Sequence, residues 1–326
     1  MNGPSARTIS TDEYGRYGVH GTLAYHYTTA DAGLHRIVPG GTLLLNPFNR
    51  MRDPIENKDW LRSAGYVGGR SHGEWGRGLR GAAQRLRSYA KARPGRGDYE
   101  GPINAVYNAA SRLQRFTKVL SFTHDAPPAP EDLYGVIWAD AYGRGYARPR
   151  MWEQYGENHE GVCLAFDRES LHNALEPVLT LLGPTFPGAI QYSVEHFVRH
   201  SRVRSLYAHE ILKLGEGSYD RGMRRHVENH IADLFFTKLP DWESEHEYRY
   251  VVLSDDESRN PAPFGDSLRA VILGERFPRS GLKNAHNVCT SAGVELGMIR
   301  WGPYPPEVFD PFEGPRVPAA DPLSEL

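Results

Sequence analysis

Short runs of apolar and β-branched residues alternate along the chain with amphipathic segments, which predicts a mixture of strands and helices. A strand is expected where such a run ends at turn-forming residues, and a helix where apolar positions recur at helical spacing behind a capping residue. The predicted strands are 22–27, 42–45, 118–123, 162–166, 189–192, 242–253, 268–274 and 294–300. The predicted helices are 29–36, 82–92, 103–116, 151–155, 168–182, 193–213 and 219–236.

The order of these elements favours an α+β fold, because strands and helices do not alternate strictly as they do in a doubly wound sheet. We expect a mixed or antiparallel split β-sheet with flanking helices, in a single catalytic-type domain over residues 21–301. Residues 1–20 are polar and contain Gly, and are expected to form a flexible arm. Residues 302–326 are rich in Pro and acidic residues, and are expected to form an extended tail.

Residues 61–118 differ from the rest of the chain in charge. They contain 12 Lys and Arg residues and three acidic residues, although the formal net charge of the whole chain is −2. This surplus predicts a basic helical insertion. Its charges either form a solvated helical face or contact the phosphates of a nucleotide or nucleic acid.

The composition indicates a cytoplasmic protein without a membrane partner. The 326 residues include only two cysteines, which excludes a disulfide framework and fits a reducing compartment. The first residues lack the apolar stretch of a signal peptide. No apolar run is long enough for a transmembrane helix.

Several motifs with known chemistry are absent from the sequence. No glycine-rich dinucleotide fingerprint, Walker A motif, paired-cysteine motif or hydrolase nucleophile elbow occurs. The pairs His196/His200 and His226/His230 have a spacing that zinc ligands can adopt when a third ligand converges, but no His-Glu-x-x-His motif occurs and both helices are otherwise charged. We therefore expect no metal site.

The segment 242–253 carries the most informative pattern of polar residues. If it is a strand, Glu245, Glu247 and Arg249 share one face because side chains alternate. Two acids and a guanidinium on a strand with an apolar opposite face are costly to bury without a use. The segment therefore predicts one wall of a polar cleft. The alternative is an edge strand with a solvated row of salt bridges.

Three motifs resemble those of a widespread bacterial family known only as a domain of unknown function, over roughly residues 22–300. The residues that carry the resemblance are Tyr25-His26-Tyr27-Thr28 with Asp53-Pro54-Ile55-Glu56, then Met151-Trp152, Tyr155, His159 and Gly161, and finally Lys238, Trp242, Glu245, Glu247 and Arg249. The chain departs from the family pattern in the residues Arg50-Met51-Arg52 and in the basic segment.

That family is in turn similar to ADP-ribosyltransferases of the DarT type. The similarity lies in an opening His-Tyr-Thr strand, a helix, a turn with a second strand, and a late strand with a glutamate. It implies an ADP-ribosyltransferase-like fold and an enzyme that consumes NAD as a substrate. The ADP-ribose would pass to an unknown protein, nucleic-acid or small-molecule acceptor, or to water. The protein would then act as a toxin, a defence effector or a metabolic modifier.

The resemblance also implies catalytic roles. Glu247 would be the catalytic carboxylate, which stabilises the oxocarbenium-like transition state at the ribose. Arg249 beside it would keep Glu247 ionised. Glu245 would orient the acceptor or act as its general base.

Further residues would bind the cofactor-like substrate. His26, with Thr28 beside it, would bind the ribose on the adenosine side. One of three aromatic residues would stack on nicotinamide: Tyr27, Trp152 or Tyr155. Either Arg50 or Arg52 would bind the pyrophosphate.

Each of these assignments has a structural alternative. His26 is then a hydrogen-bonded core histidine, Trp152 and Tyr155 are core anchors, and Lys238 caps a helix. Two alternative functions also remain. One is a non-catalytic module that binds nucleotides or nucleic acid through residues 61–118, and the other is a hydrolase that uses the glutamate pair with a metal.

Overall fold

The computed structural model describes residues 21–53, 56, 100–126, 142–195, 203, 218–302 and 306–312. The strands of its main sheet are β1 (Leu23–Thr28), β3 (Asn46–Pro47), β4 (Thr117–His124), β5 (Val162–Asp167), β6 (Thr185–Ala189), β9 (Glu247–Leu253), β11 (Leu268–Leu273), β12 (Glu295–Arg300) and β13 (Glu307–Phe309). Two smaller sheets pair β2 (Thr42–Leu44) with β10 (Pro261–Pro263), and β7 (Gln191–Tyr192) with β8 (Thr237–Lys238).

The helical elements surround this sheet. They are η1 (Ala32–Ile37), α1 (Val38–Gly40), η2 (Phe48–Arg50), α3 (Glu100–Phe116), α5 (Pro149–Gln154), α6 (Arg168–Leu182), α9 (Tyr219–Asn229), α10 (Ile231–Phe235), η4 (Pro240–Glu245), η5 (Gly265–Ser267), η6 (Arg279–Gly281) and α11 (Leu282–Ala292). In the described part of the chain, no helix combines the length and the apolar character that crossing a membrane requires.

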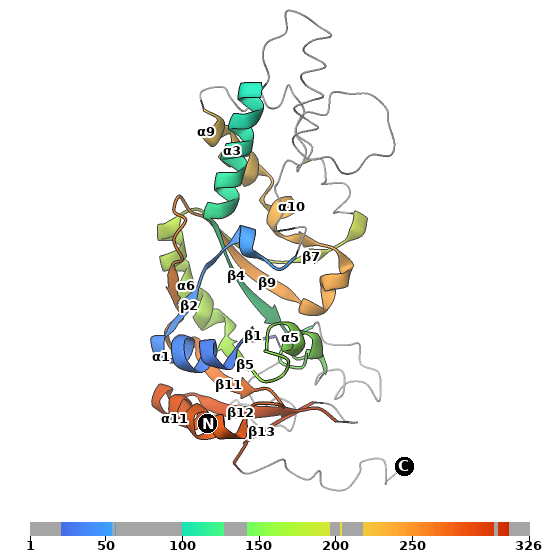
Figure 1. The fold of residues 1–326 in the computed structure, drawn as a ribbon, viewed down its shortest axis with the longest axis vertical. Coiled ribbons are helices and arrows are strands. Elements are labelled where there is room, and N and C mark those ends of the chain that lie inside the picture. The colour runs from blue at the N-terminus through green and yellow to red at the C-terminus, as the bar shows by residue number, and fades with distance from the viewer. Residues whose placement is uncertain are drawn as a thin grey trace, which may run out of the picture.

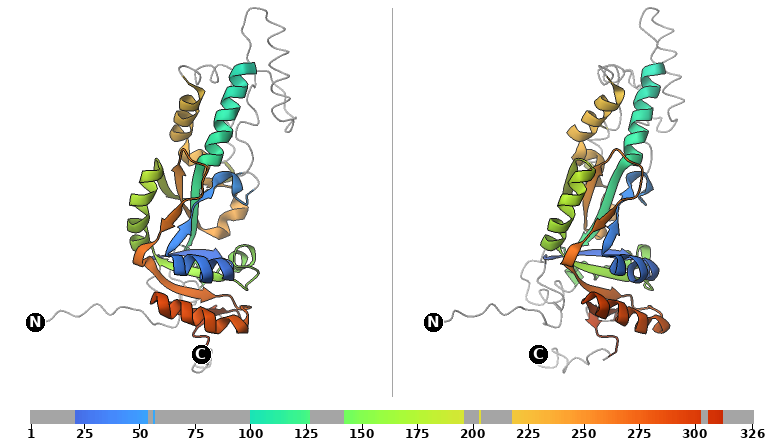
Figure 2. Two further views of the ribbon diagram at one scale, coloured as in Figure 1. Left: turned by 60° about the vertical axis from the view of Figure 1, so that its left-hand side comes forward. Right: turned by 90° about the vertical axis from the view of Figure 1, so that its left-hand side faces the viewer.

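The nine strands of the main sheet run in the order β13-β12-β11-β5-β1-β4-β9-β6, with β3 paired to β4 (Figure 1). The β11–β12 pair is parallel and the other pairs of this sheet are antiparallel. The helices α3 and α9 lie side by side at one end of the molecule, and α11 lies at the other end with β12 and β13 (Figures 1 and 2). This mixed sheet with flanking helices confirms the predicted α+β class.

The sheet is continuous rather than split, but one junction is narrow. β1 pairs with β5 along all six of its residues, whereas only Ala24 and Tyr25 are in register with β4. Beyond Tyr25 the two strands separate, and the far end of β4 pairs with β3 instead. The prediction of a split sheet was therefore wrong in its connectivity, because this short stretch of pairing joins the two halves.

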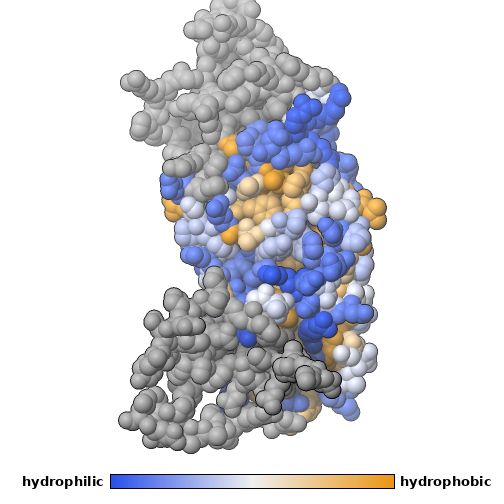
Figure 3. All heavy atoms as spheres, turned by 180° about the vertical axis from the view of Figure 1, so that it is seen from behind, coloured by the Kyte–Doolittle hydropathy of each residue, from blue (hydrophilic) through white to orange (hydrophobic). Residues whose placement is uncertain are grey.

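Different helices cover the two faces of the sheet. On one face, apolar residues of η1, α6 and α11 pack on β5, β11 and the neighbouring strands. On the other face, α3, α9 and α10 cover the β4–β9 end, and α5 covers the β1–β5 end. Away from these covered faces, the described surface seen from behind is mostly hydrophilic, with one band of apolar side chains (Figure 3).

Helix α6 illustrates how local sequence fixes an element. Asp167 ends β5, and its carboxylate accepts a hydrogen bond from the backbone N–H of Ser170 at 2.9 Å, which caps the helix. Leu171, Leu175 and Leu179 follow at helical spacing and are all buried against the sheet. The predicted helix 168–182 and its cap are confirmed.

Replacing Asp167 with alanine should lower the free energy of unfolding by about 1 kcal/mol, because the helix loses its side-chain cap. Urea denaturation of the two proteins measures this difference. Asp167→Asn keeps an oxygen acceptor at the same position and should retain most of the stability. Equal losses in the alanine and asparagine variants would contradict a capping role.

Several predicted elements begin, end or divide differently in the structure, among them the predicted helix 219–236, which is divided at His230 into α9 and α10. The predicted strand 242–253 begins only at Glu247, because Pro240 starts the 3-10 helix η4 and His246 then adopts a left-handed conformation with φ of 42°. The predicted strand 189–192 is divided between β6 and β7, which pair with different partners. Residues 307–309 of the predicted tail form β13, which pairs with β12.

Most of the predicted basic segment lies outside the described residues, as do residues 1–20, the end of the tail, and His196 and His200. The part that is described, α3, contributes to the core. Val106, Ala109, Ala110 and Leu113 of this helix are buried against β4 and β9.

Candidate functional site

Five charged side chains meet on the face of the sheet that carries α3 and α5. We call this group the ion cluster, and it consists of Glu56, Lys238, Glu245, Glu247 and Arg249. Four different parts of the chain supply them: the segment after η2, strand β8, the end of η4, and strand β9. The side chains are at least 94% buried, with Arg249 at 0% and Glu247 at 6% exposure. Burying this many charges is costly unless they are paired.

Arg249 connects two carboxylates. Its Nε and Nη2 atoms donate to the carboxylate of Glu247 at 2.8 and 2.7 Å, in the bidentate arrangement that suits a guanidinium. Its Nη1 atom donates to Glu56 at 2.6 Å and to the backbone oxygen of Phe235 at 2.8 Å. The guanidinium is therefore fixed in one orientation.

Lys238 connects a second pair of carboxylates. Its ammonium donates to Glu247 at 2.7 Å and to Glu245 at 2.8 Å, and lies 3.8 Å from Glu56. The same ammonium lies 5.1 Å from the centre of the Trp242 ring, within the range of a cation–π interaction. Glu247 is thus held by both cations of the cluster.

One edge of the ion cluster is formed by partly or fully exposed side chains. We call this edge the rim, and it consists of Tyr155, Arg52 and Trp242. The Tyr155 hydroxyl donates to Glu245 at 3.0 Å, and the Arg52 guanidinium lies 4.6 Å from the centre of the Tyr155 ring. Trp242 is also half-buried there. On β7, the Tyr192 hydroxyl accepts a hydrogen bond from the backbone N–H of Glu247 at 2.9 Å.

The local backbone explains how Glu245 and Glu247 reach the same ammonium. Glu245 is the last residue of η4, and the left-handed residue His246 then turns the chain into β9, so that both carboxylates reach Lys238. The prediction that Glu245 and Glu247 lie on one strand is therefore wrong, because Glu245 ends η4. The prediction that their side chains lie together is confirmed by their shared partner, Lys238.

The charges of the cluster do not balance if every group is ionised, because three carboxylates share two cations. Burial opposes ionisation of Glu247, but Arg249 and Lys238 outweigh it and hold the pKa of Glu247 well below its ordinary value. For Glu56, burial is the larger effect and raises its pKa. The Oε2 atom of Glu56 also has no hydrogen-bond partner in the described structure. Of Glu56 and Glu247, Glu56 is therefore the carboxyl group that more readily holds a proton.

The two cations remain charged. Burial alone would lower the pKa of Lys238, but the carboxylates of Glu247 and Glu56 reverse this and raise it. The pKa of Arg249 is raised in the same way. Protonating Glu56 alone would make the formal charge of the cluster zero.

His26 does not meet Glu247, which contradicts the prediction. Tyr25, Thr123 and Glu247 are neighbours across three strands and share one face of the sheet. His26 follows Tyr25 and points to the opposite face, where its ring packs edge-on against Phe122 at 5.9 Å. Alternation along β1 thus separates the imidazole from the ion cluster.

His26 has a structural partner instead. Its Nδ1 atom lies 3.1 Å from the backbone oxygen of Ser121, which can only accept, so this nitrogen carries the proton. The contact lies where β1 separates from β4, beyond the last pair in register. Burial lowers the pKa of His26 and favours the neutral ring. The alternative of a hydrogen-bonded core histidine describes this residue.

Most of the other predicted substrate-binding residues also lie away from the cluster. Tyr27 is buried, and its hydroxyl donates to the backbone oxygen of Gly145 at 2.6 Å. Trp152 is 0% exposed, packs edge-on against Tyr27 and donates to the backbone oxygen of Tyr146 at 2.8 Å. Because neither ring is accessible, neither is placed to stack on a ligand.

The remaining predicted residues differ in position. Thr28 lies half-buried at the end of β1, on the face that His26 occupies. Arg50 is exposed at the end of η2. Arg52 and Tyr155, by contrast, both lie at the rim. The structure therefore brings together Glu245, Glu247, Arg249, Tyr155 and Arg52.

Four residues of this site were absent from the predicted set: Glu56, Lys238, Trp242 and Tyr192. Glu56 and Lys238 belong to the motifs that carry the family resemblance, so a signal for them existed, but each had an adequate explanation as a helix cap. Tyr192 follows Gln191 in an ordinary strand pattern and carried no signal of its own.

The fold and the ion cluster together define an α+β protein with a buried, ion-paired carboxylate centre. A family model described as a protein of unknown function (DUF2971) matches residues 151–250. This range includes Tyr155 and the Lys238–Arg249 segment but not Glu56, and it confirms the predicted resemblance to a family of unknown function. No curated protein and no solved structure matches the chain.

Proposed function

We propose that the ion cluster is the catalytic centre of an NAD-consuming enzyme, which transfers ADP-ribose to an acceptor or to water. The observation that carries this proposal is that Glu245 and Glu247 share one ammonium, at 2.8 and 2.7 Å from Lys238. Paired carboxylates are the usual means of cleaving a glycosidic bond through an oxocarbenium-like transition state.

The reaction needs one carboxylate that stays ionised. As the bond between the ribose C1′ and the nicotinamide nitrogen breaks, its electron pair goes to the pyridinium ring, and neutral nicotinamide leaves. The positive charge that develops on the ribose is stabilised by Glu247. Two cations favour the charged form of Glu247, so it remains an anion at neutral pH.

Glu245 has the complementary role in this proposal. The hydroxyl of the acceptor, or of water, adds to C1′ and gives its proton to Glu245 as general base. Glu245 is the carboxylate nearest to the rim, because its partner Tyr155 is only half-buried. For an acceptor to reach Glu245, the Tyr155 hydroxyl must leave it. Arg52 beside Tyr155 is exposed. Its Nη1 atom donates to the backbone oxygen of Gln154, and its other nitrogens can bind the pyrophosphate.

Three of the predicted substrate-binding residues have no part in this mechanism. His26 is omitted because it lies opposite Glu247, and Tyr27 and Trp152 because their rings are buried in the core. The proposal therefore differs from the DarT-type pattern in the residues that would bind the adenosine end of NAD.

The direct experiment measures nicotinamide released when the purified protein is incubated with NAD, and follows labelled ADP-ribose to water or to an added acceptor. The wild-type protein should release nicotinamide. Glu243→Gln should do the same, because Glu243 is an exposed residue of η4 outside the cluster. Folded wild-type protein that releases no more nicotinamide than buffer would overturn the proposal.

A further inference from the structure

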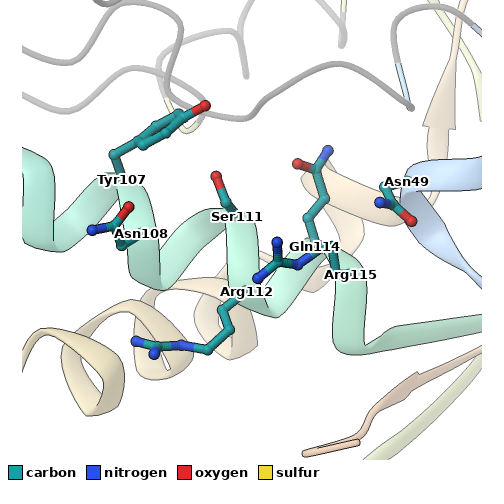
Figure 4. Close-up of a pocket in the computed structure, with 7 residues that line it drawn as sticks. All are labelled: Asn49, Tyr107, Asn108, Ser111, Arg112, Gln114 and Arg115. Carbon is teal, nitrogen blue, oxygen red and sulfur yellow. The ribbon is translucent and has the colours of Figure 1, made fainter. Parts of the chain in front are cut away.

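A cavity of about 560 Å³ lies beside helix α3. It is lined by Asn49, Tyr107, Asn108, Ser111, Arg112, Gln114 and Arg115 (Figure 4). The proposed catalysis uses none of these residues. The volume falls within the range of small-molecule sites, roughly 300–1,000 Å³. Each described residue of the lining carries a polar group, and that of Gln114 already donates to the backbone oxygen of Glu56 at 3.3 Å.

The helical repeat places the polar side chains of α3 in rows that face away from the core. Val106, Ala109, Ala110 and Leu113 occupy the row that packs into the core. The opposite rows carry the polar residues at helical spacing, so Tyr107, Ser111 and Gln114 point to the same side (Figure 4). The amphipathic pattern of α3 therefore builds a core contact and a polar cavity wall from one helix.

Several lining side chains have unused hydrogen-bonding capacity. Within the described part of the chain, Asn49, Asn108 and Ser111 make no side-chain hydrogen bond. The amides can both donate and accept, and the hydroxyl can do the same. These groups suit the hydroxyl groups of a sugar and the polar edge of a base.

The two arginines of the cavity differ in their pairing. Arg112 forms a close ion pair with Asp220 of α9. Among the described residues, Arg115 Nε lies 3.9 Å from Oε1 of the adjacent acid Glu257, and this distance is too long for a hydrogen bond. The Arg115 side chain is 49% exposed. The guanidinium of Arg115 can therefore donate hydrogen bonds to an anionic ligand. Its planar, bidentate geometry matches a phosphate group.

We propose that this cavity binds a nucleotide through one phosphate ester. Arg115 contacts the phosphate, Ser111 and Asn108 contact the sugar and the base edge, and the half-buried Tyr107 ring lies beside the base. Tyr107 and Arg115 are eight positions apart, which is about 12 Å along a helix. This length accommodates a base, a sugar and a phosphate in succession. Stacking on an aromatic ring is tolerant of base identity.

The ligand is either a free mononucleotide or one nucleotide of a single strand. Both sources present the same phosphate ester to Arg115. Their salt dependences differ, because a strand that contacts the protein through several phosphates loses affinity more steeply with salt than a mononucleotide does.

Binding is tested by calorimetric titration of the full-length protein with the four nucleoside monophosphates, a short mixed-sequence RNA strand and inorganic phosphate. At least one monophosphate or the strand should bind, and Arg115→Ala should weaken that binding by about tenfold or more. Arg225→Ala removes an exposed arginine of α9 that does not line the cavity, and is the matched control for the loss of one positive charge.

Three results would overturn the proposal. These are no binding of any nucleotide at millimolar concentration, equal losses in the Arg115 and Arg225 variants, and inorganic phosphate binding as tightly as the nucleotides. Glu247→Gln should retain this binding, because Glu247 does not line the cavity. A failure of NAD turnover therefore leaves the nucleotide result unaffected, and the reverse also holds.

Discussion

Replacing Glu247 with glutamine is expected to lower the rate of nicotinamide release from NAD by about 10²–10³-fold, the usual cost of losing one group that stabilises transition-state charge. Glutamine has nearly the same shape but no negative charge, so it cannot stabilise the oxocarbenium-like ribose. The measurement is kcat for nicotinamide release at neutral pH. Glu243→Gln, which removes an equivalent charge outside the cluster, should leave kcat unchanged.

Glu247 also pairs with Arg249 and Lys238, so Glu247→Gln can lower activity either by unfolding the protein or by slowing the reaction. These two effects must be measured separately. Thermal unfolding establishes whether the variant is folded at the assay temperature. Glu247→Asp provides a second comparison, since it keeps the charge but withdraws it by one methylene group. A folded Glu247→Gln protein with wild-type turnover would rule out the catalytic role.

The variant Arg249→Met should lose about 3–5 kcal/mol of unfolding free energy, because removing one partner of a buried ion pair leaves an uncompensated charge. Arg249 is fully buried, and its removal deprives both Glu247 and Glu56 of their guanidinium. Urea denaturation at neutral pH measures the loss. The double variant Arg249→Met/Glu247→Gln should recover part of it, since the stranded charge is then absent.

The contribution of Glu247 to the free energy of unfolding should change with pH in opposite directions in the Arg249→Met variant and in the wild-type protein. In the wild type, the lowered pKa of Glu247 stabilises the folded state at pH values above 4.5, the ordinary pKa of a glutamate. This contribution is lost as the pH falls below that value. Without Arg249, burial favours the protonated carboxyl groups, so acidification should restore stability. A single variant that loses less than about 1 kcal/mol would show that the pairing contributes little.

The sequence was sufficient where local rules decide the structure. The α6 segment could be placed from Asp167 and the leucine spacing that follows it, because the cap and the apolar stripe lie within one helix. The α+β class followed similarly from the order of the elements. The strand at Glu247 was found, but its start was misplaced because the left-handed conformation of His246 has no sequence marker such as glycine.

The site was only partly accessible to the same reasoning. Alternation within a strand gave Glu247 and Arg249 a common face, and this is correct. The face of His26 relative to Glu247 depends on the registers of β1 with β4 and of β4 with β9, which no single segment encodes. The contact between Glu56 and Arg249 joins residues 193 positions apart, so only the motif resemblance associated them.

The narrow junction between β1 and β4 has a mechanical consequence. A sheet resists shear through its inter-strand hydrogen bonds, so a seam with two registered residues resists it less than the longer strand pairs on either side. Tyr155 follows α5 on the β1–β5 side of the seam. Glu245 lies on the other side, where it shares Lys238 of β8 with Glu247 of β9. The hydrogen bond from the Tyr155 hydroxyl to the Glu245 carboxylate therefore crosses the seam. Loss of this hydrogen bond would remove one link across the seam, and α6, which packs on β5 on one side and on β9 on the other, would still join the two halves of the sheet.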